Sequence, residues 1–312
     1  MEVYITGASG LVGRYVITEL LDNTDYGVIA VSSCPSVVKE RYNSSGRFKS
    51  IGYNDFFASC TVCGKTQAVG GGKMLIHSAF TRKNDFFEVK RGIDLARNVF
   101  QKAKELEFDG VLNISSRSIY KEPDEGCLNT EDSELNLAGP ITVGKYTVEL
   151  LAEAIIGGNG IPYSNLRLAS VNEQKTDNNM VRPLNVFVDN VIAGKPIRVV
   201  GGMQVMSFIA PEDIATAISS LIEVGPSKWR NKYNIGTGWK CTDTLLNMAN
   251  LVVERGKAIG LTPVNINIEE KVIIQRAGLD ITKITEDTGW TPVVTLSEMI
   301  DSLFEMKLHN SN

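Results

Sequence analysis

The chain has 312 residues, of which 43% are hydrophobic and 22% are charged, and its formal net charge is −4. This size and composition are typical of one large globular domain or two interlocked ones. The slightly acidic balance gives no reason to expect a nucleic acid or an anionic membrane as a partner. No run of about 18 apolar residues is present, and no basic stretch with an apolar core precedes the first predicted strand. We therefore expect a cytoplasmic protein without a membrane span.

Five cysteines are scattered through the chain. An odd number of cysteines at long spacings favours reduced thiols over a disulfide framework. Cys60 and Cys63 form a C-x-x-C pair, but a structural zinc site would require a second pair nearby, and none follows. We expect neither a metal site nor a redox centre.

The first residues, MEVYITGASGLVGRY, contain the strongest motif. The apolar run 3–5 predicts a buried strand, the glycines Gly7, Gly10 and Gly13 follow it, and a helical pattern comes next. In such a unit the first glycine permits a tight turn, the second lets a pyrophosphate approach the backbone, and the third lets the helix pack close to the strand. The free N–H groups and the positive end of the helix then face the anion. The motif predicts a dinucleotide-binding loop.

The second predicted strand, 27–31, ends in Ser32 and Ser33. In a dinucleotide-binding fold the end of this strand meets the adenine ribose, where an Asp or Glu would accept from the 2′-hydroxyl and repel a 2′-phosphate. Serine at this place, with Lys39 and Arg41 a few residues further on, favours NADP(H) over NAD(H). The alternative is that Lys39 and Arg41 are an exposed surface pair.

Strands and helices continue to alternate along the chain. Strands are predicted at 48–52, 74–76, 111–114 and 163–168, and helices at 56–68, 86–107 and 142–156. This alternation is typical of a parallel sheet that helices cover on both faces, so the predicted fold class is a doubly wound α/β fold.

From residue 171 onwards the pattern is less regular. Helices are predicted at 184–193, 211–224 and 242–257, and short strands at 197–200, 205–209 and 233–236. We divide the chain into a dinucleotide-binding domain at 1–170 and a mainly substrate-binding lobe at 171–312. The segments near 185–195, 211–224 and 233–236 are expected to return to the first domain.

Several short motifs occur in a characteristic order. They are TGASGLVG at 6–13, HSA at 77–79, SSRSIY at 115–120 and GWTP at 289–292. Together they resemble the extended short-chain dehydrogenase/reductase family, the NAD-dependent epimerases and dehydratases that act mainly on nucleotide sugars. The resemblance implies a Rossmann fold with a smaller C-terminal substrate-binding lobe. It also implies that the substrate is a nucleotide sugar or a related polar small molecule.

The resemblance also implies which residues contact the cofactor. These are Gly7, Ser9, Gly10, Leu11, Val12, Gly13, Ser32, Ser33, Asp55, Ala79 and Lys145. Among them, Asp55 falls where the family places an aspartate against the adenine.

The family's chemistry depends on a Y-x-x-x-K pair, because a spacing of four residues brings both side chains to one face of a helix. Lys145 fits the lysine, but the tyrosine position is Ile141, which has no proton to give. Ser116 matches the serine that binds the substrate oxygen. Tyr120 is a spare phenol near the same strand end, and the alternative for it is a packed aromatic residue.

The substrate-facing positions also depart from the family. The family's R-x-x-N motif ends in Ser170 here, and its phosphate-binding arginine falls on Met206. The candidates for substrate contact are Phe80, Ser116, Ser170, Asn172 and Arg276.

Two functions remain open. The first is an NAD(P)-dependent epimerase, dehydratase or reductase with a non-standard acid/base, in which Lys145 exchanges the proton once burial lowers its pKa. The second is a catalytically weak or inactive protein of the same fold that binds a dinucleotide. Under either function the resemblance implies a homodimer formed through the helices at 86–107 and 142–156.

Overall fold

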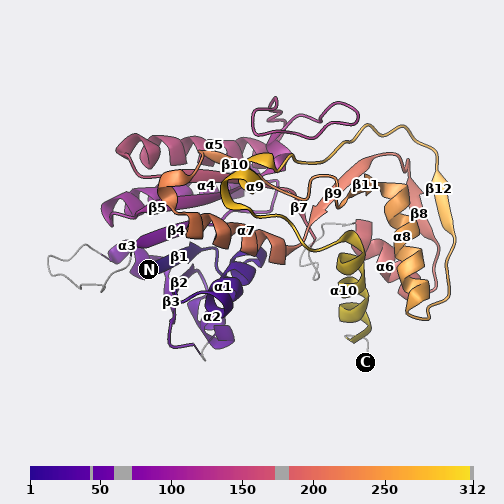
Figure 1. Cartoon of the computed structure of the whole chain (residues 1–312), viewed down its shortest axis with the longest axis horizontal. Coiled ribbons are helices and arrows are strands. Elements are labelled where there is room, and N and C mark those ends of the chain that lie inside the picture. Colours follow the sequence, from indigo (N-terminus) through magenta and orange to yellow (C-terminus); the bar gives the residue numbers. More distant parts are fainter. Residues whose placement is uncertain (43–44, 60–71, 173–182, 310–312) are drawn as a thin grey trace.

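The larger part of the molecule is a parallel sheet of seven strands (Figure 1). The computed structural model describes residues 1–42, 45–59, 72–172 and 183–309. The sheet order is β10-β6-β5-β4-β1-β2-β3, and every neighbouring pair is parallel, which confirms the predicted doubly wound α/β class. The strands are β1 (Glu2–Thr6), β2 (Gly27–Ser32), β3 (Phe48–Gly52), β4 (Lys73–His77), β5 (Gly110–Ser116), β6 (Tyr163–Leu168) and β10 (Lys232–Ile235).

Helices cover both faces of this sheet. One face carries α1 (Leu11–Asn23) and α7 (Pro211–Val224), which contact each other. The opposite face carries α4 (Phe86–Glu105) and α5 (Pro140–Ile155), which also lie side by side. Two shorter helices, α2 (Pro35–Tyr42) and α3 (Tyr53–Ala58), lie against the β2–β3 edge.

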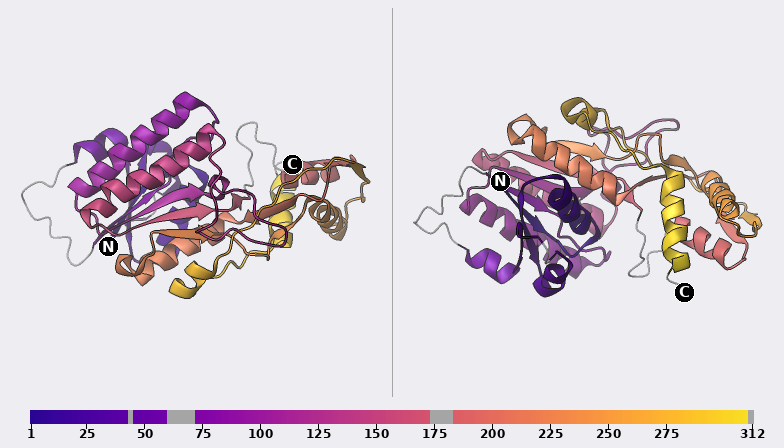
Figure 2. Two further views of the ribbon diagram at one scale, coloured as in Figure 1. Left: turned by 90° about the horizontal axis from the view of Figure 1, so that it is seen from above. Right: turned by 60° about the horizontal axis from the view of Figure 1, so that its bottom comes forward.

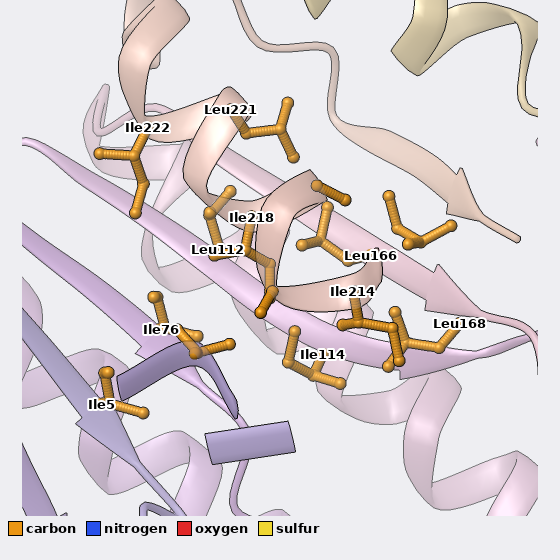
Figure 3. Packing of buried hydrophobic residues seen from close by; sticks show 14 of the residues in the cluster. Ile5, Ile76, Leu112, Ile114, Leu166, Leu168, Ile214, Ile218, Leu221 and Ile222 are labelled. Atoms are coloured by element: carbon orange, nitrogen blue, oxygen red, sulfur yellow. The ribbon is translucent and has the colours of Figure 1, made fainter. Parts of the chain in front are cut away.

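The strands are apolar on both sides because helices bury both faces of the sheet. On the α7 side, Ile5, Ile76 and Leu112 of the strands pack in one layer with Ile214 and Ile218 of the helix (Figure 3). None of these five side chains is more than 1% exposed. Burying a side chain of this size contributes about 1.5–3 kcal/mol. This layer therefore holds the strand ends in fixed positions for the pocket described below.

The C-terminal lobe has its own hydrophobic core and stands to one side of the large sheet (Figure 2). Its helices are α6 (Pro183–Ile192), α8 (Leu245–Ala258) and α10 (Leu296–His309). Two of its strands, β8 (Ile197–Val200) and β12 (Ile266–Glu269), form a parallel pair. Three others form a small sheet in the order β11 (Thr242–Thr244), β9 (Val205–Ile209) and β7 (Ser170–Val171). A short helix, α9 (Thr282–Thr288), contacts α7 and β10. Within the described ranges, no helix has the length and apolar character needed to span a membrane.

The helix α6 does not return to the large sheet, contrary to our expectation for 185–195. Its buried side chains, including Leu184, Phe187 and Val188, belong to the lobe core with α8 and α10. A helical pattern shows which face is apolar but not which element covers that face. By contrast, α7 packs against α1, and β10 pairs with β6, so these two segments do lie with the large sheet.

Two predicted helix boundaries also change. The helix predicted at 56–68 begins earlier, at Tyr53, and α3 ends at Ala58. Residues 60–71, with the Cys60 and Cys63 pair, lie outside the described ranges. The helix predicted at 242–257 begins at Leu245, because the Thr244 hydroxyl accepts from the third N–H beyond it and caps the helix.

A buried ion pair joins β6 to α5. A guanidinium nitrogen of Arg167 lies 2.7 Å from a carboxylate oxygen of Glu149, and both side chains are 5% exposed. The guanidinium also donates to the hydroxyl of Tyr120 at 2.8 Å and to the carbonyl oxygen of Glu131 at 3.0 Å. Removing one partner of such a pair leaves an uncompensated charge in the interior.

We therefore expect Glu149→Ala to lower the free energy of unfolding by about 3–5 kcal/mol. Urea unfolding followed by circular dichroism measures the change. Glu134→Ala is the matched control, because its ion pair with Lys121 is exposed and it should change the stability little. Equal effects of the two variants would contradict the structural role of the buried pair.

Candidate cofactor and substrate site

A pocket of ≈ 1270 Å³ lies at the carboxyl ends of the parallel strands, where the large sheet meets the C-terminal lobe. The lobe contributes Pro183, Met206 and Phe208, and the segments after β1, β2, β4, β5 and β6 contribute the opposite wall. Open α/β sheets bind their ligands at this edge. The predicted site residues in the lining are Gly7, Ser9, Gly10, Leu11, Val12, Ser32, Ser33, Ala79, Phe80, Ser116, Lys145 and Ser170.

The glycine loop allows the backbone to approach a ligand closely. Gly7 has a φ of +69°, and a Cβ there would lie 2.8 Å from the backbone nitrogen of Ala79. A Cβ on Gly13 would lie 2.5 Å from the carbonyl oxygen of Gly7, so only glycine lets α1 begin this close to β1. Gly10 is the N-cap of α1, and no side chain caps this end. The first N–H groups of α1 are therefore free for an anion, and the loop fits a dinucleotide pyrophosphate.

The end of β2 presents hydroxyl groups rather than a carboxylate. Ser32 is buried, Ser33 is exposed, and both line the pocket. Asp55 lies outside the lining, because its Oδ2 accepts from the N–H of Gly52 at 3.3 Å and caps α3. Tyr53, at the start of the same helix, lines the pocket instead. The position of Asp55 does not support the adenine contact expected for it.

Lys145 reaches into the pocket from α5. Its Nζ donates to the carbonyl oxygen of Ile114 at 2.7 Å and lies 4.6 Å from the centre of the Phe80 ring. Burial lowers the pKa of Lys145 to about 8, and the negative charge of Glu149 opposes this shift. Ile141, four residues earlier on α5, lines the same pocket. The pocket thus holds a buried lysine, with an aliphatic side chain four residues before it on the same helix.

Ser116 and Tyr120 have different surroundings. Ser116 lines the pocket, where its Oγ lies 3.0 Å from the Oγ of Ser118. Tyr120 is buried outside the lining, and its hydroxyl donates to Asn234 and accepts from Arg167, each at 2.8 Å. Burial raises the pKa of this phenol above its usual value. These contacts support the packed-aromatic alternative for Tyr120 and not a catalytic role.

Two of the predicted substrate contacts lie outside the pocket lining. Asn172 is 4% exposed, and its N–H donates to the carbonyl oxygen of Ile209 across the lobe sheet. Arg276 lies 3.3 Å from a carboxylate oxygen of Glu125. Phe80 and Ser170 do line the pocket.

Sequence reasoning missed several polar residues of the pocket. Arg82, Asn84, Arg91 and Arg117 all belong to the lining. A signal was available for Arg117, because it lies inside the SSRSIY motif directly after a predicted strand, where α/β proteins meet their ligands. The other three follow β4 or lie on α4, and the sequence does not show which way their side chains point.

His77 has a structural environment. Its Nδ1 lies 2.8 Å from the Oγ1 of Thr6, and its ring packs edge-on against Phe100. Burial and the charge of Lys145 lower its pKa to about 3, so the ring is neutral near pH 7. Among the residues that the structure describes, no group of three or more His, Cys, Asp and Glu side chains could hold a metal ion.

The glycine loop leads to a binding prediction. We expect Gly10→Ala to fold but to bind dinucleotides at least about tenfold more weakly, because its methyl group would stand where the backbone faces the pyrophosphate. Gly46→Ala is the control, since a Cβ there meets nothing within 4 Å. Equilibrium binding of NADH and NADPH, followed by their fluorescence, measures both variants. Unchanged affinity in Gly10→Ala would contradict the assignment of this loop.

Comparison with known proteins agrees with this geometry. Over 99% of each chain, the protein is 24% identical to a Methanocaldococcus jannaschii protein named as a candidate UDP-glucose 4-epimerase. The structure is similar to that of a UDP-glucuronic acid 4-epimerase from Bacillus cereus in complex with NAD, with a TM-score of 0.79, 20% identity and 100% of both chains covered. It is also similar to a UDP-glucose 4-epimerase from Thermotoga maritima, with a TM-score of 0.75, 20% identity and 100% of both chains covered. The sequence pattern of the NAD dependent epimerase/dehydratase family matches residues 3–236, and the chain belongs to that family.

Proposed function

We propose that this protein is an NAD(P)-dependent epimerase, dehydratase or reductase for a nucleotide sugar or a related polar substrate, and that Lys145 is its proton-transfer group. The observation that carries this proposal is the pair Lys145 and Ile141 in one pocket. The ammonium of Lys145 is held at the strand ends, and the residue four positions earlier cannot exchange a proton. The three relatives described above are named as UDP-sugar 4-epimerases, which supports a nucleotide sugar as the substrate class.

The residues of the pocket supply binding, orientation and proton transfer. A bound nicotinamide cofactor supplies the chemistry of hydride transfer to and from a substrate carbon. Ser116 orients the substrate oxygen on that carbon, and the neutral amine of Lys145 accepts its proton. A pKa of about 8 makes this role feasible, because a substantial fraction of Lys145 is then unprotonated near pH 8.

The alternative is a protein that binds the dinucleotide and turns over slowly or not at all. Ile141 favours it, as does the hydroxyl of Tyr120, which is already held by Arg167 and Asn234. General acid–base catalysis contributes a factor of about 10²–10⁴, so its loss would leave a weak enzyme.

For the cofactor we propose a preference for NADP(H) over NAD(H). The support is the pair Ser32 and Ser33 at the end of β2, because neither side chain repels a 2′-phosphate. Among the described residues of the lining, the single carboxylate is that of Glu88 on α4.

We also propose that the protein is a homodimer formed through α4 and α5. Large apolar side chains on these two helices are exposed in the single chain, namely Phe86, Phe87, Val143 and Leu150. Exposed apolar side chains on two adjacent helices are typical of a protein interface. Sedimentation equilibrium is expected to give twice the chain mass for the wild type and the single mass for Leu150→Glu. A monomeric wild type would contradict the dimer.

The proton-transfer proposal is tested by restoring the missing phenol. Ile141→Tyr places a tyrosine four residues before Lys145 and is expected to raise kcat by about 10²–10⁴, since it adds a second proton-transfer group. Ile141→Phe is the matched control, because it adds the ring without the hydroxyl. Chromatographic assays of UDP-glucose and UDP-glucuronate conversion measure the change. If Ile141→Tyr raises kcat no more than Ile141→Phe does, position 141 does not face the reacting atoms.

The role of Lys145 has its own signature in pH. For the wild type we expect kcat/KM to rise tenfold per pH unit below pH 8 and to level off above it, because only the unprotonated amine accepts a proton. Lys145→Arg keeps the charge but cannot exchange a proton near pH 8, so it should retain cofactor binding and lose turnover. Lys145→Ala should lose turnover as well and, unlike Lys145→Arg, should also weaken cofactor binding. Unchanged turnover in either variant would contradict the assigned role, and cofactor binding without turnover in the wild type would favour the alternative function.

The cofactor preference is tested at the exposed serine of β2. Ser33→Asp is expected to weaken NADPH binding at least about tenfold and to leave NADH binding nearly unchanged, because a carboxylate repels the 2′-phosphate. Ser33→Asn is the control of similar size without the charge. Tighter binding of NADH than of NADPH by the wild type would overturn the preference.

A further inference from the structure

Arg117 is a pocket residue that the proposed chemistry does not use. It follows the last residue of β5 and begins a short 3₁₀ turn, Arg117–Ile119, between the two serines Ser116 and Ser118. The side chain lines the pocket, and its Nε lies 3.5 Å from the Oγ of Ser170, just after β6. The guanidinium therefore lies between the ends of two neighbouring strands, on the side of the lobe.

The described lining of the pocket holds more basic than acidic side chains. Among the described residues that line it, four basic side chains accompany one acid, Glu88. Glu88 already pairs with Arg91 at 3.2 Å. Arg117 has no carboxylate within ion-pair distance in the described part of the chain, although Glu122 attracts it from further away. Burial lowers the pKa of Arg117, which reflects the cost of removing its charge from water without a counter-ion.

The position of Arg117 separates it from the pyrophosphate of the cofactor. In the sheet β4 lies between β5 and β1, so the end of β5 is about 10 Å from the glycine loop after β1. Arg117 also points away from that loop, toward Ser170 of β7, which directly follows the far neighbour β6. It adjoins Ser116, the residue that we place at the reacting oxygen. The described residues give Arg117 no counter-ion within ion-pair distance, so an anionic group of the substrate, close to its reacting carbon, is the partner that we consider.

We propose that Arg117 binds a carboxylate on the reacting sugar, so that the substrate is a nucleotide-activated uronic acid. This inference rests on the proposed function. In a pyranose that reacts at C4, a carboxylate on C5 is attached beside the reacting carbon, whereas the diphosphate is attached to C1 across the ring. The planar guanidinium fork matches a carboxylate with two parallel hydrogen bonds. The hydroxyl of Ser170 lies beside the same guanidinium.

The test is a comparison of ligands that differ in one charge. Isothermal titration of the NAD-loaded protein with UDP-glucuronate, UDP-glucose and UDP is expected to give about 10- to 100-fold tighter binding of UDP-glucuronate than of UDP-glucose. Arg117→Gln should abolish this ratio while leaving the affinities for UDP-glucose and UDP unchanged. Arg117→Lys should retain part of the ratio. Arg91→Gln is the matched control, because Arg91 already has Glu88 as its partner and its loss should preserve the ratio.

The outcomes separate the possible sources of the anion. Arg117→Gln weakening all three ligands by the same factor would place the guanidinium on the diphosphate and overturn the inference. A wild type that binds UDP-glucose as tightly as UDP-glucuronate would overturn it as well, while leaving the proposed function intact. Binding of neither sugar nucleotide, with NAD still bound, would overturn the proposed function and the inference together. Thermal unfolding of the variants and their NAD affinity should equal those of the wild type, which shows that a lost ratio is not a folding defect.

Discussion

The ion pair between Arg167 and Glu149 connects the stability of this fold to the chemistry of its pocket. It holds α5 against β6 inside the protein, with both side chains almost inaccessible to water. Glu149 lies one helical turn from Lys145, and its carboxylate is hydrogen-bonded to Arg167 through both oxygens. Lys145 is left with only a distant negative charge, so burial dominates and its pKa falls. The same contact that fixes the helix thus prepares an amine that can lose a proton near neutral pH.

The two halves of the pocket differ in how closely they follow the family. The glycine loop is constrained by backbone geometry, because a Cβ on Gly7 or Gly13 would overlap neighbouring main-chain atoms. The glycines that this packing requires also leave the main-chain N–H groups of the loop accessible to a pyrophosphate, so the packing and the binding site depend on the same residues. The backbone imposes no such constraint at Ile141 or Met206, whose side chains are partly exposed in the pocket lining. A different side chain at either place can therefore be accommodated without disturbing the sheet.

The sequence predicted the sheet and the glycine loop well, because buried parallel strands are continuous apolar runs and the loop needs glycine at fixed spacing. It predicted less about individual side chains. Asp55 and Tyr120 lie near strand or helix ends, yet the first caps α3 and the second is held by Arg167 and Asn234. Whether a polar side chain at such a place faces the pocket or the interior depends on partners far away in the sequence. The separate packing of α6 escaped prediction for the same reason, since its partners α8 and α10 follow more than 50 residues later.

The charges of the pocket also bear on the direction of proton transfer. Lys145 titrates near pH 8 because it is buried, so its protonation depends on the charge that arrives with each ligand. An oxidised nicotinamide is cationic and favours the neutral amine, which can accept the proton of a substrate hydroxyl. A reduced nicotinamide is neutral and would favour the ammonium form, which could return the proton to a carbonyl oxygen. Under the proposed function, one lysine without a tyrosine four residues before it could then serve both half-reactions, because the charge on the cofactor, rather than a second side chain, would set which form of Lys145 is present.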